Sequence, residues 1–356
     1  MTSLLRTSAE VSPPWLTEVL RADGLVDSAR VVGFSAEPVG AGQMGECTRF
    51  VLDYDRAEAN APASVIGKFA ATDETARQFM ASTGYRNECC FYSSFARRLS
   101  VRSPRCSLAV IDDDGWFTLL LEDLAPAAPG DQLAGCTLEQ VELAVIERVG
   151  LHAPLWGDAE LASHACFAAR TSFGADLVTA GLAAAVPGFL ERYAHALDDA
   201  QVSCFERLAT GGANWFGRRP APTTLVHSDY RPDNLLFGTA AGGPPVAVVD
   251  WQGLALGSGL SDVGFIVGNA LPVEVRRAHE PRLVQEYHRA LTAAGVDLAW
   301  DRCWQDYRLG LLSGLLTTVF GAMYGVRTDR GDRMFELMAA RHATQILDLG
   351  ADEFLA

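Results

Sequence analysis

The chain has 356 residues, of which 49% are hydrophobic, and a formal net charge of −15 at pH 7. This length and hydrophobic content are enough to bury a large core, and they suit two lobes better than one compact unit. The strong negative charge argues against broad binding to nucleic acids or to anionic membranes. Composition therefore predicts a soluble globular protein with neither kind of partner.

The amino-terminal residues show no basic region followed by a continuous apolar run, so we expect no signal peptide. The eight cysteines are scattered, without a Cys-x-x-Cys pair, which favours reduced thiols over a disulfide framework or a zinc site. Both observations predict a cytoplasmic protein. The uncharged stretch 309–326 is long enough to cross a membrane, but its Gly, Ser, Thr and Tyr content favours a buried helix over a membrane span.

A short helix and a strand open the chain. Residues 13–23 begin with two prolines and are followed by Gly24, as is typical of a short helix, and residues 31–38 predict a strand.

A glycine motif follows this strand. Gly40, Gly42 and Gly45 form Gly-x-Gly-x-x-Gly, which by itself is a weak signal because dinucleotide-binding turns share it. Residues 48–54 are rich in strand formers and show no helix start. Strand, glycine loop and strand is the arrangement that covers nucleotide phosphates, and we favour it over the dinucleotide interpretation.

The third predicted strand, residues 64–70, carries Lys68, the only lysine among 29 basic residues. A chain that otherwise uses arginine keeps lysine where a compact ammonium is needed, and a phosphate contact is such a place. A helical pattern then covers 74–98, and two short strands, 106–111 and 116–121, are joined by a hairpin signal.

The organisation changes near residue 125, where prolines and a glycine interrupt the pattern. Beyond it, residues 137–152 predict an amphipathic helix with Thr137 as its cap. Residues 156–215 and 272–356 are mostly helical in pattern.

Between these helical regions lies a strand that ends at Val226, a polar loop, and a hairpin that leads to a second strand. The loop carries His227, Asp229 and Asn234, and Asp250 follows the second strand. One carboxylate can take the proton of an acceptor hydroxyl, while an amide oxygen and a second carboxylate hold magnesium against phosphates. This spacing therefore favours phosphoryl transfer from a nucleotide.

The same residues resemble the kinase superfamily, in particular its aminoglycoside phosphotransferase and choline kinase families and the ecdysteroid-kinase-like family. These families carry His-x-Asp-x-x-x-x-Asn and a later Asp that opens the metal-binding turn. The turn Asp250-Trp251-Gln252 replaces Asp-Phe-Gly and favours the ecdysteroid-kinase-like branch.

The resemblance implies an α+β fold of two protein-kinase-like lobes. Residues 1–124 would form a nucleotide-binding N-lobe with an antiparallel sheet, and residues 127–356 a mostly helical C-lobe for catalysis and acceptor binding. The hinge would lie at about 121–126.

The resemblance also implies roles for the polar loop, with ATP or GTP and Mg²⁺ as cofactors. Asp229 is expected to be the catalytic base, and Arg231 to touch the transferred phosphate. Asn234 and Asp250 are expected to hold the metal, while His227 and Asp262 support the loop structurally.

In the N-lobe, the resemblance implies that Lys68 reaches the nucleotide's α- and β-phosphates. Its expected partner is Glu88, with Glu74 as the rival and a solvent-exposed glutamate as the alternative. Gly40, Gly42 and Gly45 would cover the phosphates. Backbone groups of the hinge residues Glu122, Asp123 and Leu124 would hold the adenine edge.

We therefore predict an enzyme that phosphorylates a hydroxyl group of a small molecule. The sequence leaves the acceptor open among antibiotics, amino alcohols, steroid-like alcohols and hydroxyacyl-CoA esters, and it does not indicate an oligomeric state. Two alternatives are a kinase-like nucleotide-binding regulator without turnover and a dinucleotide-dependent oxidoreductase.

Overall fold

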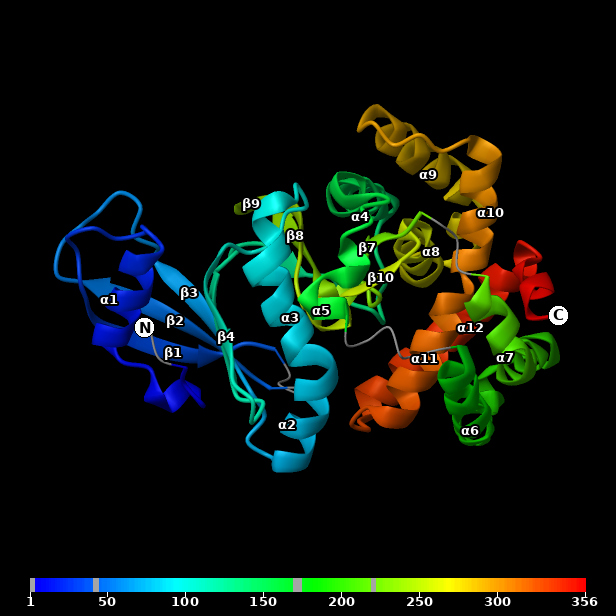
Figure 1. The fold of residues 1–356 in the computed structure, drawn as a ribbon, viewed down its shortest axis with the longest axis horizontal. Helices are drawn as coiled ribbons and strands as arrows, with labels where there is room; N and C mark the ends of the chain where they lie inside the picture. Colours follow the sequence, from blue (N-terminus) through cyan, green and yellow to red (C-terminus); the bar gives the residue numbers. More distant parts are fainter. Residues whose placement is uncertain (1–3, 41–44, 169–174, 219–221) are drawn as a thin grey trace. The chain divides into compact units, whose positions relative to one another are not determined.

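The computed structural model describes residues 4–40, 45–168, 175–218 and 222–356. The chain forms two compact units (Figure 1). The first comprises Met1–Arg98, Ser103–Pro126 and Val249–Gly253, and the second comprises Leu99–Arg102, Ala127–Val248 and Leu254–Ala356. An antiparallel sheet dominates the first unit and helices dominate the second, which confirms the predicted α+β class.

The sheet of the first unit has five antiparallel strands in the order β1-β2-β3-β5-β4. Their bounds are β1 Val31–Pro38, β2 Glu46–Tyr54, β3 Ser64–Phe69, β4 Cys106–Ile111 and β5 Phe117–Glu122. Lys68 on the central strand β3 lies opposite Cys47 of β2 and Leu119 of β5. A strand paired on both sides fixes the backbone of Lys68, so the sheet determines where its side chain starts.

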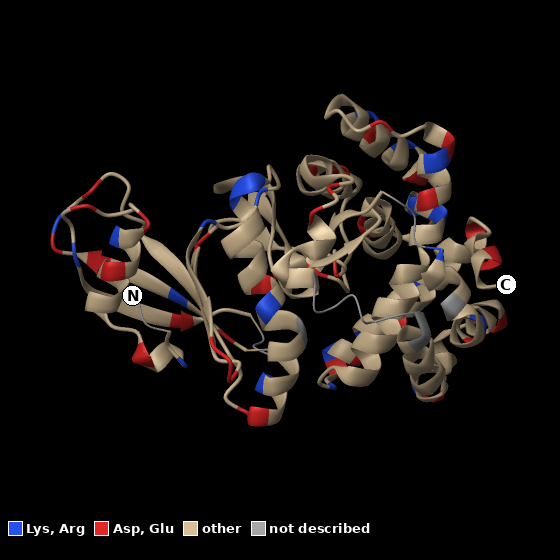
Figure 2. Ribbon diagram, in the orientation of Figure 1, with Lys and Arg blue, Asp and Glu red and all other residues tan. Residues whose placement is uncertain are grey.

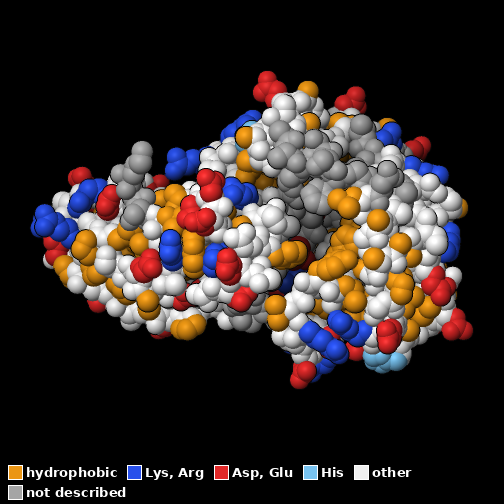
Figure 3. All heavy atoms as spheres, turned by 60° about the horizontal axis from the view of Figure 1, so that its bottom comes forward, with side chains coloured by type: hydrophobic (Ala, Val, Ile, Leu, Met, Phe, Trp, Pro, Cys, Tyr) orange, Lys and Arg blue, Asp and Glu red, His pale blue; other side chains and the backbone are white. Residues whose placement is uncertain are grey.

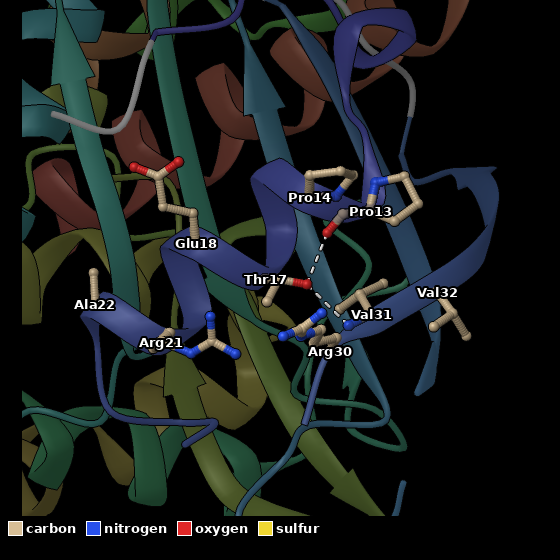
Figure 4. Close-up of a pocket in the computed structure, with 9 residues that line it drawn as sticks. All are labelled: Pro13, Pro14, Thr17, Glu18, Arg21, Ala22, Arg30, Val31 and Val32. Carbon is tan, nitrogen blue, oxygen red and sulfur yellow. Dashed lines mark hydrogen bonds between the residues drawn. The ribbon is translucent and has the colours of Figure 1, made fainter. Parts of the chain in front are cut away.

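Helix α1 (Pro13–Ala22) packs against this sheet through one buried face. The hydroxyl of Thr17 donates to the carbonyl of Pro13 at 2.9 Å and accepts the backbone N–H of Val31, the first residue of β1, at 2.9 Å. Figure 4 shows both bonds in a shallow hollow beside the helix. This buried hydroxyl therefore ties the helix to the edge strand of the sheet.

The helical segment after β3 is continuous but not uniformly wound. It consists of α2 (Glu74–Met80), a π turn (Ala81–Tyr85), α3 (Arg86–Cys90), a second π turn (Phe91–Phe95) and a 3₁₀ turn (Ala96–Arg98). The sequence predicted a helical pattern over 74–98 without indicating the π turns. Each π turn holds extra residues within the helix, a device that often occurs at functional sites.

The second unit contains two small sheets. Strands β6 (Ala128–Pro129), β8 (Leu235–Thr239) and β9 (Gly242–Val248) form one, and β7 (Thr224–Val226) pairs with β10 (Ala255–Gly257) in the other. The sequence does not indicate β10, because this strand has only three residues and two of them, alanine and glycine, are depleted in strands.

Helices make up the rest of the second unit (Figure 1). Helix α4 begins with the predicted Thr137 cap, whose hydroxyl accepts the N–H of Gln140 at 3.2 Å in a capping box. Helix α8 is buried on nearly all sides and forms the centre of the unit. The helices are α4 Leu138–His152, α5 Ala165–Ala168, α6 Ala175–Tyr193, α7 Asp199–Gly217, α8 Gly259–Ala270, α9 Val273–Ala293, α10 Trp300–Gly310, α11 Leu312–Tyr324 and α12 Asp329–Asp348.

The uncharged stretch 309–326 is divided between α10 and α11, which meet at Leu311. Among the described residues, no helix combines the length and the hydrophobicity that a membrane crossing requires. Figure 3 shows hydrophobic side chains gathered on one face of the second unit. The large hydrophobic residues of this unit with the most exposed side chains include Leu177, Tyr324 and Val326. Acidic and basic residues are interspersed over both units (Figure 2).

The interior of the second unit holds a polar side chain among apolar ones. His342 on α12 is 1% exposed, and its ring packs against that of Phe265 on α8, with 4.9 Å between the ring centroids. Burial lowers the pKa of His342 to about 3, because the charged imidazolium would lose its hydration. The folded protein therefore keeps this ring neutral at pH values where an unfolded chain, with a histidine pKa near 6.5, takes up a proton.

We predict that His342→Leu makes the protein less sensitive to acid. In the wild type the contribution of His342 to stability is fully present above about pH 6.5 and is lost progressively toward pH 3. Between pH 7 and pH 5 the wild type should lose roughly 2 kcal/mol more unfolding free energy than the variant. Urea unfolding at the two pH values measures this, and an equal pH dependence of both proteins contradicts the prediction.

Candidate active site

The polar loop runs from the end of β7 to the start of β8 in the second unit. It contains a 3₁₀ turn, Pro232–Asn234, and one residue with a left-handed backbone, Ser228, at φ 66°. Such a conformation costs free energy for a residue other than glycine and persists where surrounding contacts impose it.

Within the loop, three of the predicted site residues come together. Asn234 Nδ2 donates to the Asp229 carboxylate at 2.9 Å and to the Asp229 carbonyl at 2.8 Å. Arg231 Nε donates to the same carboxylate at 3.1 Å. Because the amide nitrogen of Asn234 is used as the donor, its Oδ1 remains as an acceptor. The Asp229 side chain is thus fixed in orientation while 34% of it stays exposed.

Arg231 is held by a second carboxylate as well. Arg231 Nη1 donates to the Asp233 carboxylate at 2.6 Å. Asp233 also accepts from Arg330 Nη1 at 2.9 Å and from the backbone N–H of Gln132 at 2.9 Å. Although burial opposes it, attraction to Asp229 and Asp233 raises the pKa of Arg231. In this structure Arg231 therefore braces the Asp229 carboxylate.

Asp262, in the first turn of α8, holds the beginning of the loop. Its carboxylate accepts the backbone N–H groups of His227 at 2.7 Å and Ser228 at 3.0 Å. These two bonds impose the left-handed conformation of Ser228. The carboxylate is 1% exposed.

Two side chains of α4 compensate the buried charge of Asp262. His152 Nε2 lies 3.5 Å and Arg148 Nη1 lies 3.7 Å from the Asp262 carboxylate. Burial alone would raise the pKa of Asp262, but the hydrogen bond from His152 and the positive charge of Arg148 outweigh it and hold that pKa at about 2. Burial lowers the pKa of His152, whose Nδ1 lies 2.8 Å from the Tyr287 hydroxyl. A neutral ring that donates from Nε2 and accepts at Nδ1 satisfies both contacts.

His227 is fully buried, and its Nδ1 faces the backbone N–H of Asp229 at 3.4 Å. The arrangement of this ring is that of an internal support for the loop, with Asp229 as the accessible carboxylate.

The first unit brings together a lysine and two carboxylates. Lys68 Nζ lies 2.8 Å and 2.7 Å from the two oxygens of Glu88 and 3.2 Å from Asp250 Oδ1. Burial opposes the charge of the ammonium, but the attraction of Asp250 and Glu88 raises the pKa of Lys68. Glu74, the rival partner, is exposed at the start of α2.

The residues after Asp250 pack on the segment that carries Glu88. The Trp251 ring stacks on Phe91 with 3.5 Å between the ring centroids. Asn87 Nδ2 donates to the Gln252 carbonyl at 2.7 Å, and Gln252 Nε2 to Glu88 at 3.4 Å. Asp250 itself has a left-handed backbone, with φ 64°. Trp251 and Gln252 therefore hold the turn of Asp250 against the helical segment.

The glycine motif is described in part, because Gly42 lies outside the described residues. Gly40 has φ 74°, and a Cβ atom on Gly45 would lie 2.6 Å from the carbonyl oxygen of Phe69. The backbone N–H of Val39 donates to the Cys47 carbonyl at 2.8 Å, so the flanks of the loop are joined. The loop connects two antiparallel strands, as the kinase arrangement requires and the dinucleotide one does not.

The predicted hinge residues lie at the end of β5 and directly after it. Glu122 ends β5, and Leu124 is buried. The Asp123 side chain is bound to Arg49 at 2.6 Å and to Ser64 at 2.7 Å. Its carboxylate is thus engaged within the first unit.

Several residues of the site were not predicted. Arg148 and His152 belong to a predicted helix, but a helical pattern does not show which of its buried positions will meet a distant carboxylate. Asp233 adjoins predicted residues and was not singled out, and Gln252 was noted as part of the turn after Asp250 but not as a partner of Glu88. For Arg148 the available signal is a charged residue on the apolar face of its helix.

We predict that Asp262→Asn lowers the melting temperature by roughly 5 °C or more, because breaking a buried charge network costs about 3 kcal/mol. A single amide oxygen cannot replace the carboxylate toward His227, Ser228 and His152. Thermal unfolding measures the effect. The matched control is Asp297→Asn, an exposed loop position, which should melt like the wild type. Equal melting of both variants contradicts the assigned role.

Comparison with known proteins identifies the family. The model of the phosphotransferase enzyme family matches residues 107–304. No curated protein sequence matches the chain. Among solved structures, a Plasmodium vivax ethanolamine kinase has a TM-score of 0.52 at 10% identity, covering 94% of this chain and 86% of its own. The gentamicin-APH(2")-IIa complex has a TM-score of 0.52 at 15% identity, and the match covers 97% of this chain and 99% of the chain in that structure.

A microcompartment-associated aminopropanol kinase is similar at a TM-score of 0.50 and 13% identity, covering 96% of this chain and all of its own. At these identities the likeness shows a shared fold, and the family match, which spans more than half of the chain, shows the relationship. The chain therefore belongs to the phosphotransferase enzyme family.

Proposed function

We propose that the protein is a small-molecule kinase that moves the γ-phosphoryl group of ATP or GTP, with Mg²⁺, onto a hydroxyl group. One observation carries this proposal: the Asp229 carboxylate is held in place by Asn234 and Arg231 and yet is partly exposed. A fixed and accessible carboxylate is what a general base for a hydroxyl requires. Membership of the phosphotransferase enzyme family supports the same reaction class. So do the names of the similar structures, which are an ethanolamine kinase, an aminopropanol kinase and a complex of APH(2")-IIa with gentamicin.

In the proposed reaction the acceptor hydroxyl gives its proton to Asp229 as its oxygen attacks the γ-phosphorus. The bond from that phosphorus to the bridging oxygen breaks, and the nucleoside diphosphate leaves with the electron pair. Arg231 keeps the carboxylate oriented, and we propose that it also touches the transferred phosphate. Asp262 and His227 act through the backbone of the loop and are positioning residues.

We propose that Lys68 contacts the nucleotide phosphates. Glu88 holds its ammonium in place through two contacts below 3 Å. The glycine loop around Gly40 and Gly45 would cover the same phosphates, with backbone groups at Glu122, Asp123 and Leu124 against the adenine edge.

The donor set of Asn234 and Asp250 fits a magnesium ion. An amide oxygen and a carboxylate are hard oxygen ligands of the kind that Mg²⁺ prefers, and Asn234 Oδ1 remains available after its nitrogen has bound Asp229. When bound, the ion would neutralise charge on the phosphates. Within the superfamily we propose the ecdysteroid-kinase-like branch, on the basis of Asp250-Trp251-Gln252.

Transfer of labelled γ-phosphate tests the function directly. ATP and GTP are each offered with antibiotics, amino alcohols, sterols and hydroxyacyl-CoA esters as acceptors. A product that the wild type forms and Asp229→Asn does not form supports the kinase. Nucleotide binding without any product across the whole panel favours the regulator.

We predict that Asp229→Asn lowers kcat by at least about a hundredfold while the affinity for Mg-ATP stays close to that of the wild type. The reason is that the base is lost while the contacts to the nucleotide are kept. Steady-state kinetics and calorimetric nucleotide titration measure the two quantities. Asp297→Asn is the matched control, and unchanged turnover in Asp229→Asn contradicts the assignment.

For Asp250→Asn we expect a different pattern. Because a metal-binding carboxylate is removed, nucleotide affinity in the presence of Mg²⁺ should fall about tenfold or more. Binding measured in EDTA should change much less. Titrations with and without Mg²⁺ separate the two, and an equal change under both conditions contradicts a role in metal binding.

A further inference from the structure

The second unit contains a cavity of about 150 Å³ beside the polar loop that carries Asp229. Residues of β7, β10, α7, α8, α10 and α11 line it, and Ser228 of the loop forms part of its wall. Ser228 immediately precedes Asp229 in the chain. The cavity therefore borders the loop that carries the residue that we propose as the base, and Asp229 itself follows directly on a lining residue.

Most of the side-chain surface in this cavity is apolar. Large apolar residues that line it include Trp215, Val226, Phe265, Leu309 and Leu316. The indole N–H of Trp215 donates to the Leu309 carbonyl at 2.9 Å, so the one polar atom of this ring is already satisfied.

Hydroxyl groups also line the cavity, but several of them are used internally. Ser261 Oγ donates to the Ser258 carbonyl at 2.7 Å, and Ser313 Oγ to the Gly310 carbonyl at 2.6 Å. Thr317 Oγ1 donates to the Ser228 carbonyl at 3.5 Å. A hydroxyl whose hydrogen is bound to the backbone presents mainly its carbon atoms and a weak acceptor to a ligand.

Among the described residues that line the cavity, Asp262 is the only charged one. Its oxygens accept from the backbone of His227 and Ser228 and contact His152. An ammonium group in the cavity would compete with these bonds and would lose its hydration, which is costly for an unpaired charge. The lining thus selects against the cationic part of an amino alcohol or aminoglycoside.

We propose that this cavity receives the uncharged apolar part of the acceptor, so that the substrate is an alcohol bearing a neutral ring or branched hydrocarbon group. An apolar protein cavity of ~150 Å³ holds a molecule of the size of benzene. The proposal rests on the proposed kinase function, and it names the substrate class of the same site.

The test uses two isosteric alcohols, 3,3-dimethylbutan-1-ol and choline, which differ in a carbon atom replaced by a quaternary nitrogen. Binding to the full chain is measured by ligand-observed NMR with Mg-ATP present and absent. The neutral alcohol should bind at least about tenfold more tightly than choline. Equal or tighter binding of choline, or no detectable binding of the neutral alcohol, overturns the proposal.

A variant that fills the cavity provides the second arm. Ser313→Phe should weaken binding of 3,3-dimethylbutan-1-ol about tenfold or more, whereas Ser203→Phe, the same change at an exposed position of α7, should not. Mg-ATP binding by each variant reports that it is folded. Ala255→Leu, which fills the cavity from β10, replaces Ser313→Phe if the latter does not fold. Unchanged binding in a folded cavity-filling variant overturns the proposal.

Phosphate transfer to the same two alcohols separates this proposal from the kinase function. If the protein binds the neutral alcohol more tightly than choline but transfers phosphate to no acceptor, the kinase function is contradicted. The assignment of the cavity as a binding site for a neutral apolar group is then still supported. Transfer to choline in preference to the neutral isostere supports the kinase and overturns the cavity assignment.

Discussion

The buried carboxylate of Asp262 makes the interactions on which the polar loop between β7 and β8 depends. Without this carboxylate, the backbone N–H groups of His227 and Ser228 would lack these hydrogen bonds. The left-handed backbone of Ser228 would then lose the contacts that stabilise it. A buried charge is stable here because His152 and Arg148 of α4 lie against it. The geometry of Asp229 is thus set from three places in the chain that are remote in sequence.

In the first unit a partly buried cation, the ammonium of Lys68, is likewise held by groups of opposite charge. Lys68 is fixed at its root by a strand with partners on both sides and at its tip by Glu88 and Asp250. Glu88 lies between two π turns, and Phe91 in the second of them supports Trp251. The turn that carries Asp250 is consequently held by stacking and hydrogen bonds as well as by the ion pair.

The sequence was sufficient for the fold class, and local patterns also supplied the candidate residues, whose roles stay predictions. Strand-forming residues between turn signals indicated the strands of the first unit, and the spacing from His227 to Asn234 predicted a loop with a catalytic carboxylate. The π turns were missed because extra residues in a helix preserve its overall hydrophobic pattern. Strand β10 and the roles of Arg148 and His152 were missed because they arise from packing between distant segments, which no local pattern records.

Lys68 is the only lysine in the sequence, and its side chain is 18% exposed beside Glu88 and Asp250. Apart from the α-amino group, the protein therefore has a single amine, and it lies within the proposed nucleotide site. Because attraction to Asp250 and Glu88 raises the pKa of Lys68, its ammonium stays protonated at neutral pH, and amine-directed reagents, which attack the neutral amine, will modify this side chain only slowly.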